Sequence, residues 1–327
     1  MATKKPKTSA KSVKTKATKS KTAAKTVEKP VSEATKITTE KTVTETPAET
    51  KSEPKEKAEK TEKVGGDSFL KGFFAKKYEE KESILTVFKK PKFYGALLGE
   101  VLGTALITLT LFSLLFMGVY DIARFAGFAV IAVYVMVYAF SGAFLNPIVA
   151  VGMMATRRIS AIRGVMYIVA EIIGAWIGWL VFNLFHLAGG EGTTADLPAL
   201  AAIVEGKFWV TAMIEFLGAT IIAFSFVRAL EYKRSIFTFA ATIAGGLILA
   251  FITCFSVSYF YLGLSGNFML NPAVALMSQI FPTSGENFGE ILGGICQALS
   301  VYALFPMLGG VLGFYLSDFT DKLTKAE

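Results

Sequence analysis

Histidine and cysteine are scarce in this chain. His186 is the only histidine in 327 residues, and the two cysteines, Cys254 and Cys296, both lie in apolar segments. No disulfide framework, CxxC metal pattern or histidine cluster is therefore available, and acid–base catalysis by histidine has almost nothing to work with. We expect no metal, no cofactor and no enzymatic step.

Aromatic residues are missing from the first 66 positions, which are dominated by Lys, Thr, Ala, Ser and Glu. Such a segment cannot bury enough apolar surface to offset the entropy of ordering it, so residues 1–66 are expected to form a disordered cytoplasmic tail. Most of the lysines lie there, so the net charge of +8 does not indicate a nucleic-acid surface on a folded domain. The tail is either a solvated segment or an arm attracted to anionic lipid, RNA or a partner.

Residues 67–93 differ in kind from the tail. Phe69, Phe73 and Tyr78 recur at roughly helical spacing, with lysines between them. This pattern indicates either an amphipathic juxtamembrane helix on the inner membrane face or an ordered linker.

The rest of the chain is almost continuously apolar. Six segments approach the roughly 20 residues that a helix needs to cross a bilayer. They are Tyr94–Val119, Phe125–Phe140, Gly164–Leu187, Phe208–Leu230, Ile236–Ser258 and Gly289–Leu316. The predicted fold is an all-α membrane protein, with a channel domain over residues 94–318 and a short cytoplasmic C-terminal tail over 319–327.

The distribution of basic residues predicts the orientation of this bundle. If the spans alternate, one side collects the Lys-rich tail and most basic loop residues, namely Arg157, Arg158, Arg163, Arg228, Lys233, Arg234, Lys322 and Lys325. Basic residues concentrate in cytoplasmic loops, so we expect both termini in the cytoplasm of a cell whose plasma membrane the protein spans several times.

Two short stretches within the apolar sequence repeat each other. Residues 145–150 read Leu-Asn-Pro-Ile-Val-Ala and residues 270–275 read Leu-Asn-Pro-Ala-Val-Ala. Pro suits the first turn of a helix, and broken helices persist in a bilayer only where they are buried in protein or line a cavity. We therefore expect two re-entrant half-helices that start at mid-membrane depth, one in each half of an inverted repeat. Asn146 and Asn271 either line a pore with their amides or merely cap these half-helices.

The paired Asn-Pro boxes resemble those of the aquaporin and glycerol-facilitator (major intrinsic protein) family, of which this chain looks like an atypical member. The resemblance covers residues 94–316 and includes the first re-entrant loop, the third helix, and the glutamate helices that precede each box. These motifs are the segments Ser141–Pro147, Tyr167–Ala175, Glu100–Thr104 and Glu215–Ala219. The family implies a passive channel with one pore per subunit of a homotetramer.

Intramembrane carboxylates are costly unless their hydrogen bonds are satisfied. Glu100 and Glu215 are therefore either proton relays of a coupled transporter or supports that accept hydrogen bonds from the re-entrant loops, and the family resemblance implies the second role. Glu171 takes a position where the family usually has a neutral Gln, and its role is left open.

The selectivity residues depart from the family pattern. Val274 stands where the family usually has a filter Arg, which removes a fixed charge and a fork of donors. Counting from the two Asn residues places the other constriction positions at Ala126, Tyr259 and Phe268, and Phe268 resembles the aromatic of glycerol-conducting members.

Two further pore positions are unusual within the first loop. Phe144 replaces the usual His, and Ile148 is the third residue of the first box. A wall of alkyl and aromatic groups suits glycerol, because the carbon atoms of glycerol can lie against it. The predicted function is therefore a passive channel for glycerol, with water as a second solute. The alternatives are a water-selective or broad neutral-solute (urea-like) channel, or a non-conducting membrane anchor whose basic tail binds partners.

Close helix packing is expected at small residues in the spans, because a missing side chain lets two backbones approach. The candidates for such contacts are Gly174, Gly178, Gly218, Gly293 and Gly294.

Overall fold

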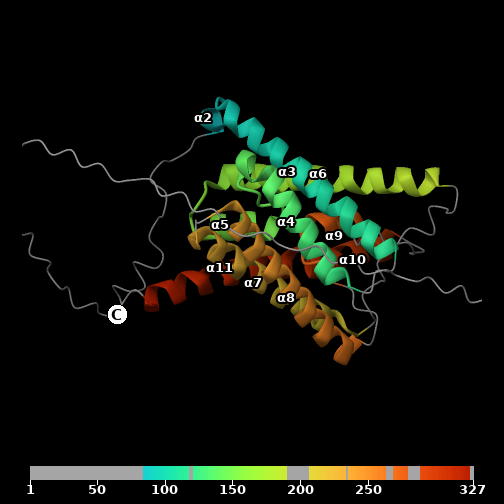
Figure 1. Ribbon diagram of the computed structural model, residues 1–327. Coiled ribbons are helices and arrows are strands. Elements are labelled where there is room, and N and C mark those ends of the chain that lie inside the picture. Colours follow the sequence, from blue (N-terminus) through green and yellow to red (C-terminus); the bar gives the residue numbers. More distant parts are fainter. Residues whose placement is uncertain are drawn as a thin grey trace, which may run out of the picture. The chain divides into compact units, whose positions relative to one another are not determined.

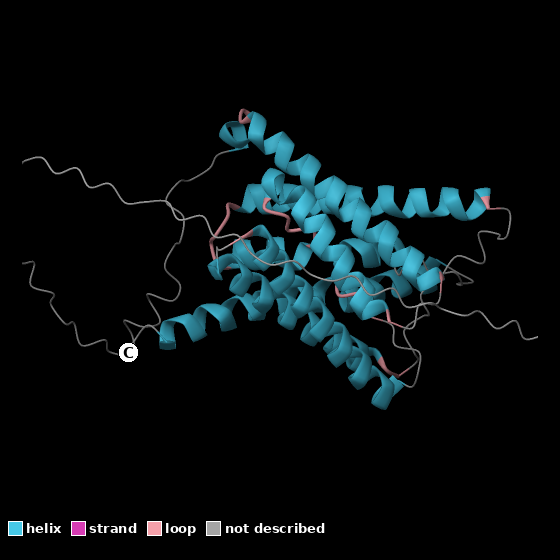
Figure 2. Ribbon diagram, viewed as in Figure 1, coloured by secondary structure: helices cyan, strands magenta, loops and turns pink. Residues whose placement is uncertain are grey.

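The structure, a computed structural model, describes residues 84–117, 121–189, 206–232, 235–262, 268–278 and 288–324. Within these residues every regular element is helical, with short loops between helices (Figure 2). The expected tail over residues 1–66 and most of the expected juxtamembrane segment lie outside the described residues.

The same order of helices occurs twice along the chain: two long helices, a short helix and then another long helical segment (Figure 1). The first half contains α2 (Ile84–Phe88), α3 (Pro91–Phe116), α4 (Ile122–Ser141), α5 (Pro147–Ala155) and α6 (Ala161–Ala188). The second half contains α7 (Phe208–Tyr232), α8 (Ile236–Leu262), α9 (Pro272–Ser278), α10 (Phe288–Leu299), the π-helical η2 (Ser300–Leu304) and α11 (Phe305–Thr324).

The six expected spans are confirmed. Six stretches of the described chain are long and apolar enough to cross a membrane: α3, α4, α6, α7, α8 and the continuous run α10–η2–α11. The first of these helices begins at Pro91, three residues before the expected start. The last one continues to Thr324, so most of the segment expected as a C-terminal tail is helix.

Local sequence explains where these helices begin and end. Pro91 occupies the first turn of α3, where its missing N–H has no partner to lose. The Ser160 side chain caps α6 by accepting from the Arg163 N–H at 3.4 Å. At the end of α4, Gly142 adopts φ of 84°, the left-handed conformation that stops a helix and turns the chain into the first re-entrant loop.

The packing of the helices shows the inverted repeat. In the first half α3 packs against α4 and α6, and in the second half α7 packs in the same way against α8 and α11. The halves are joined through α4 and α8. Each half-helix also crosses over, because α5 contacts α11 and α9 contacts α6. The short helices α5 and α9 are therefore enclosed by spans from both halves.

Glycine allows the closest of these contacts. A Cβ atom on Gly174 or Gly178 of α6 would collide with the backbone carbonyls of Val101 or Ala105 of α3. The second half repeats this arrangement, since Gly309 and Gly313 of α11 meet carbonyls of α7. These pairs follow the small-xxx-small spacing that brings membrane helices together.

Two of the other expected packing glycines differ in whether a neighbouring residue lies close to them. Gly218 lies against the Leu270 side chain and the Cys254 sulfur, as expected, whereas Gly293 has no atom within 4 Å of the position of a Cβ. The prediction for Gly293 was wrong, because small size permits a close neighbour but does not supply one.

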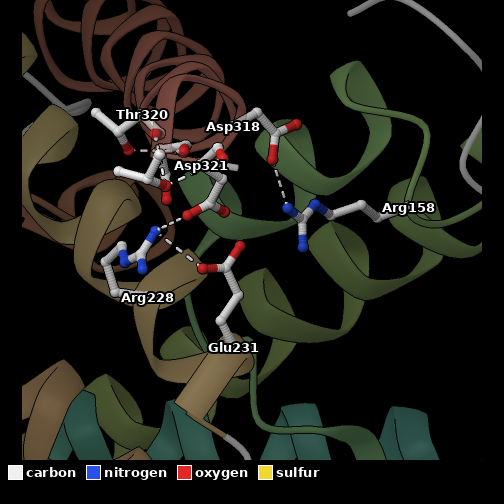
Figure 3. Close-up of polar contacts among 8 residues, drawn as sticks. Arg158, Arg228, Glu231, Asp318, Thr320 and Asp321 are labelled. Carbon is white, nitrogen blue, oxygen red and sulfur yellow. Dashed lines mark hydrogen bonds and ion pairs between the residues drawn. The ribbon is translucent and has the colours of Figure 1, made fainter. Parts of the chain in front are cut away.

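One end of the bundle carries an ion-pair cluster (Figure 3). Arg158, in the turn after α5, pairs with Asp318 of α11 at 2.6 Å. Arg228 of α7 contacts both Glu231, at 2.9 Å, and Asp321. Since Arg158 belongs to the first half and α11 to the second, the cluster joins the two halves at this end.

A matched pair of substitutions tests the glycine contacts. Gly174→Ala adds one methyl group against the α3 backbone, so we expect a lower melting temperature and partial aggregation in detergent. Gly245→Ala is the control, because nothing lies within 4 Å of its Cβ position. Replacing Gly by Ala in an open helix position stabilises by roughly 0.5–1 kcal/mol. Equal melting temperatures for the two variants would contradict the proposed close packing.

Candidate functional site

Each Asn-Pro box starts a half-helix in the middle of the bundle. The Asn146 Oδ1 accepts a hydrogen bond from the Ile148 N–H at 3.1 Å, and Pro147 follows at the first helical position. The Asn271 Oδ1 accepts in the same way from the Ala273 N–H at 3.1 Å. Both asparagines therefore cap their half-helices with their oxygen atoms.

The nitrogen atoms of the same amides connect the two halves. Asn146 Nδ2 donates to the Leu270 carbonyl at 2.9 Å, and Asn271 Nδ2 donates to the Leu145 carbonyl at 3.0 Å. The tips of α5 and α9 thus meet, with the two asparagines side by side. An amide nitrogen has two hydrogens, so each Asn keeps a second N–H beyond the one that bridges the halves.

A strained backbone makes these bridges geometrically possible. Leu145 has φ of 55° and Leu270 has φ of 54°, a left-handed conformation that is uncommon for residues other than glycine. The two residues occupy the same position in their boxes, immediately before Asn. The conformation is therefore part of the repeated unit, and it directs each leucine carbonyl to the opposite asparagine.

Two buried carboxylates hold the loops that precede the half-helices. Glu100 of α3 accepts the Phe144 N–H at 3.0 Å with Oε1 and the Leu145 N–H at 2.7 Å with Oε2. Such loops have no helical partners for their N–H groups, and in a bilayer each unpaired group costs several kcal/mol.

Glu215 of α7 supports the loop of the second half in the same way. It accepts the Met269 N–H at 2.6 Å with Oε1 and the Leu270 N–H at 3.0 Å with Oε2. The side chains of Glu100 and Glu215 are both fully buried. These contacts are the ones that the supporting role requires.

Two residues without an assigned role in the sequence also touch the first loop. Glu171 of α6 accepts the Asn146 N–H at 3.1 Å. Tyr134 of α4 donates its hydroxyl to the Phe144 carbonyl at 3.2 Å. Glu171 could be noticed as an intramembrane acid, but nothing in the sequence around Tyr134 distinguishes it from an ordinary core residue.

A cavity of about 60 Å³ lies beside the two asparagines. On the same measure one water needs roughly 10–15 Å³, so there is room for a few waters or one small solute. The wall is formed by α3, α4, α7, α8, α9 and both loops. Its polar side chains are Thr110, Tyr134, Asn146 and Asn271, and none of its described lining residues is charged.

Five of the eight expected pore residues lie on this wall or directly behind it. Asn146, Asn271, Ala126 and Val274 line the cavity. Phe268 packs its ring 5.4 Å from that of Phe251, which is itself a lining residue.

The other three expected pore residues are not lining residues of this cavity. Tyr259 is 54% exposed near the end of α8, eight residues after the lining residue Phe251. Its place in the pore was predicted by counting back from Asn271 and stays a prediction. On α8 the wall is formed by Ile243, Leu247 and Phe251.

Phe144 and Ile148 are buried in the core instead. Phe144 packs edge-on against Tyr167 and Phe226, with ring centroids 5.1 and 5.7 Å away. Ile148 is fully buried, and a Cβ on Gly310 of α11 would meet its side chain. Both residues therefore pack in the core beside the first loop and α5.

Six spans, two enclosed half-helices and an apolar cavity at their joined tips define a membrane channel with an inverted repeat. A family model described as "Major intrinsic protein" matches residues 87–316. The chain belongs to this family. Its members are passive channels, so the chain is a multi-pass channel for small solutes and not an enzyme.

Similar proteins include both kinds of channel in this family. The chain is 30% identical over 192 residues to "Glycerol uptake facilitator protein-like 6" of Lactiplantibacillus plantarum, covering 57% of this chain and 79% of that one. It is 26% identical over 194 residues to "Aquaporin AqpM" of Methanothermobacter marburgensis, covering 57% and 70%. The aquaglyceroporin structure from Plasmodium falciparum shares the fold, with a TM-score of 0.50 at 16% identity over 71% of this chain and 97% of that chain.

Removal of one loop support tests its contribution. Glu215→Gln keeps an oxygen for one N–H but turns an NH₂ group toward the other. An unsatisfied buried group costs about 1–3 kcal/mol, so we expect a lower melting temperature in detergent and reduced solute flux in proteoliposomes. Glu290→Gln, at an exposed position at the start of α10, is the control. Unchanged stability and flux in Glu215→Gln would show that the loop does not need this carboxylate.

Proposed function

We propose that this chain conducts small uncharged solutes, glycerol before others, through the cavity beside Asn146 and Asn271. The observation that carries the proposal is the composition of the wall: alkyl and aromatic groups with a few amide and hydroxyl groups and no charged residue among the described lining residues. The carbon atoms of glycerol can lie against Phe251 and Leu247, while its hydroxyls meet the remaining N–H of each asparagine. The similarity to a glycerol uptake facilitator-like protein supports the same choice.

The same wall argues against ions. An ion that enters loses hydration, and an apolar wall offers no charge or carbonyl ring to replace it. The half-helices add to this barrier, because their N-termini meet at the asparagines and carry partial positive charge that disfavours cations. Val274, fully buried on the wall, leaves cation exclusion to the half-helices and desolvation.

The orientation and assembly are part of the proposal. Arg157 lies beside Arg158 in the turn after α5, and Arg163 lies in the first turn of α6, which follows that turn. We assign this end of the bundle to the cytoplasmic face of the plasma membrane. Both termini then lie in the cytoplasm. We further propose a homotetramer with a pore in each subunit, in keeping with the family.

Solute flux in proteoliposomes tests the choice of glycerol. The full chain should give fast glycerol entry and slow sorbitol entry, because sorbitol has six carbon atoms and glycerol has three. Slow entry of both solutes with fast water flux would replace the proposal with a water channel. No flux of any of the three would favour a non-conducting anchor.

Val274→Arg tests whether this cavity is the path. The long charged side chain would occupy much of a cavity of about 60 Å³, so we expect glycerol flux to fall at least tenfold. Val274→Leu is the matched control, since it stays apolar and adds one carbon, and its flux should remain within about threefold of the unmodified chain. Equal glycerol flux in the Arg variant would place the path elsewhere.

A further inference from the structure

Two buried acids hold the loop before the first half-helix. Glu100 of α3 and Glu171 of α6 are both 0% exposed, and together they accept the N–H groups of three consecutive residues, Phe144, Leu145 and Asn146. Ionised carboxylates only accept hydrogen bonds and repel each other, so holding two of them on adjacent N–H groups is unfavourable. A proton on one of the two acids removes this repulsion.

The remaining hydrogen bonds indicate which acid holds the proton. Both oxygens of Glu100 already accept N–H groups, from Phe144 and Leu145. Glu171 accepts the Asn146 N–H with Oε1, whereas its Oε2 is buried and meets no donor in the described chain. A proton on Oε2 turns this unsatisfied acceptor into a hydroxyl that donates to Glu100.

Neither acid takes part in an ion pair within the part of the chain that the structure describes. The ion pairs found among the described residues join arginines with other acids, at Asp121, Glu231, Asp318 and Asp321. The described residues also contain no group of three His, Cys, Asp or Glu side chains that could hold a metal ion. Two buried negative charges without a nearby cation would cost much free energy, so the state in which one of the acids is protonated is favoured.

The other groups that face the pair are neutral. Ser141 accepts the Ala143 N–H at 2.9 Å, and Tyr134 of α4 donates its hydroxyl to the Phe144 carbonyl at 3.2 Å. Tyr167 of α6 donates to the Ser141 carbonyl at 3.5 Å. The half-helices α5 and α9 carry no titratable side chain, and the other titratable groups of α3, Lys92 and Tyr94, are exposed near its start.

Among the described residues, the second half has no such pair. Glu215 supports its loop with two accepted N–H groups, and no described acid is hydrogen-bonded to it. A Gln in place of Glu171 would have an amide that can accept from the Asn146 N–H and donate to Glu100 at any pH. In this chain the donor exists only while Glu171 is protonated.

We propose that Glu171 is a proton-binding residue that positions the first half-helix, and that conduction falls when its proton is lost. Deprotonation would leave two negative charges on adjacent N–H groups and displace the loop that contains Leu145. The Leu145 carbonyl accepts the bridge from Asn271, so the displacement would reach the joined tips beside the cavity. The effect on conduction rests on the proposed function, whereas the proton site itself does not.

Flux measured at equal pH on both sides of proteoliposomes tests the proposal. For the full chain we expect glycerol and water flux to fall at least fivefold between about pH 6 and pH 10. Glu171→Gln replaces the acid by an amide of the same shape, so it should match the unmodified chain at pH 6 and keep that flux at pH 10. A flat profile for the unmodified chain, or the same fall in Glu171→Gln, would overturn the proposal.

Infrared spectroscopy detects the proton bound to Glu171 whether or not the channel conducts. At pH 6 the unmodified protein should show a carboxylic acid C=O band that is weaker in Glu171→Gln and that fades as pH rises. Absence of this difference would overturn the proton site even if the channel conducts. If no solute passes at any pH while the band behaves as expected, the proposed function fails and the proton site stands. Glu231→Gln, in the exposed ion pair, is the control and should leave the band unchanged.

Discussion

The channel depends on finding partners for backbone N–H groups inside a bilayer. The loops before α5 and α9 are not helical, so their N–H groups need acceptors from elsewhere in the protein. Glu100 and Glu215 each accept two of them, and the loops can then hold Leu145 and Leu270 in a left-handed conformation. The meeting of the asparagines follows from this support, and so does the cavity beside them.

The proposed function depends on the asparagine N–H groups that the hydrogen bonds between the two halves do not use. Each asparagine uses its side-chain oxygen to cap a half-helix and one N–H to bind the opposite loop. The second N–H of each amide takes part in none of these bonds. A rigid pair of donors beside an otherwise apolar wall can recognise a hydroxyl without binding it tightly. Such a site favours passage over retention, because a solute that makes few bonds also leaves easily.

The two halves share one design but differ in chemistry. The second half satisfies its loop with Glu215, whereas the first half uses a second buried acid, Glu171, which accepts the Asn146 N–H. The first half is also tied to α11 by the Arg158–Asp318 pair at the end of the bundle (Figure 3). An inverted repeat therefore need not respond symmetrically to its surroundings, since each half can keep the geometry and vary the groups that hold it.

The sequence by itself determined the spans, the half-helices and the residues at their tips. Long apolar runs must cross the bilayer as helices, and an Asn-Pro pair within them must start a new one. Tertiary structure alone decided which side chains face the cavity. Tyr259, Phe144 and Ile148 are not among the lining residues of this cavity, since the residues that face a cavity depend on helix rotation, loop path and packing against other spans. Glu100 and Glu171, 71 positions apart, likewise accept the N–H groups of adjacent residues, which no local pattern specifies.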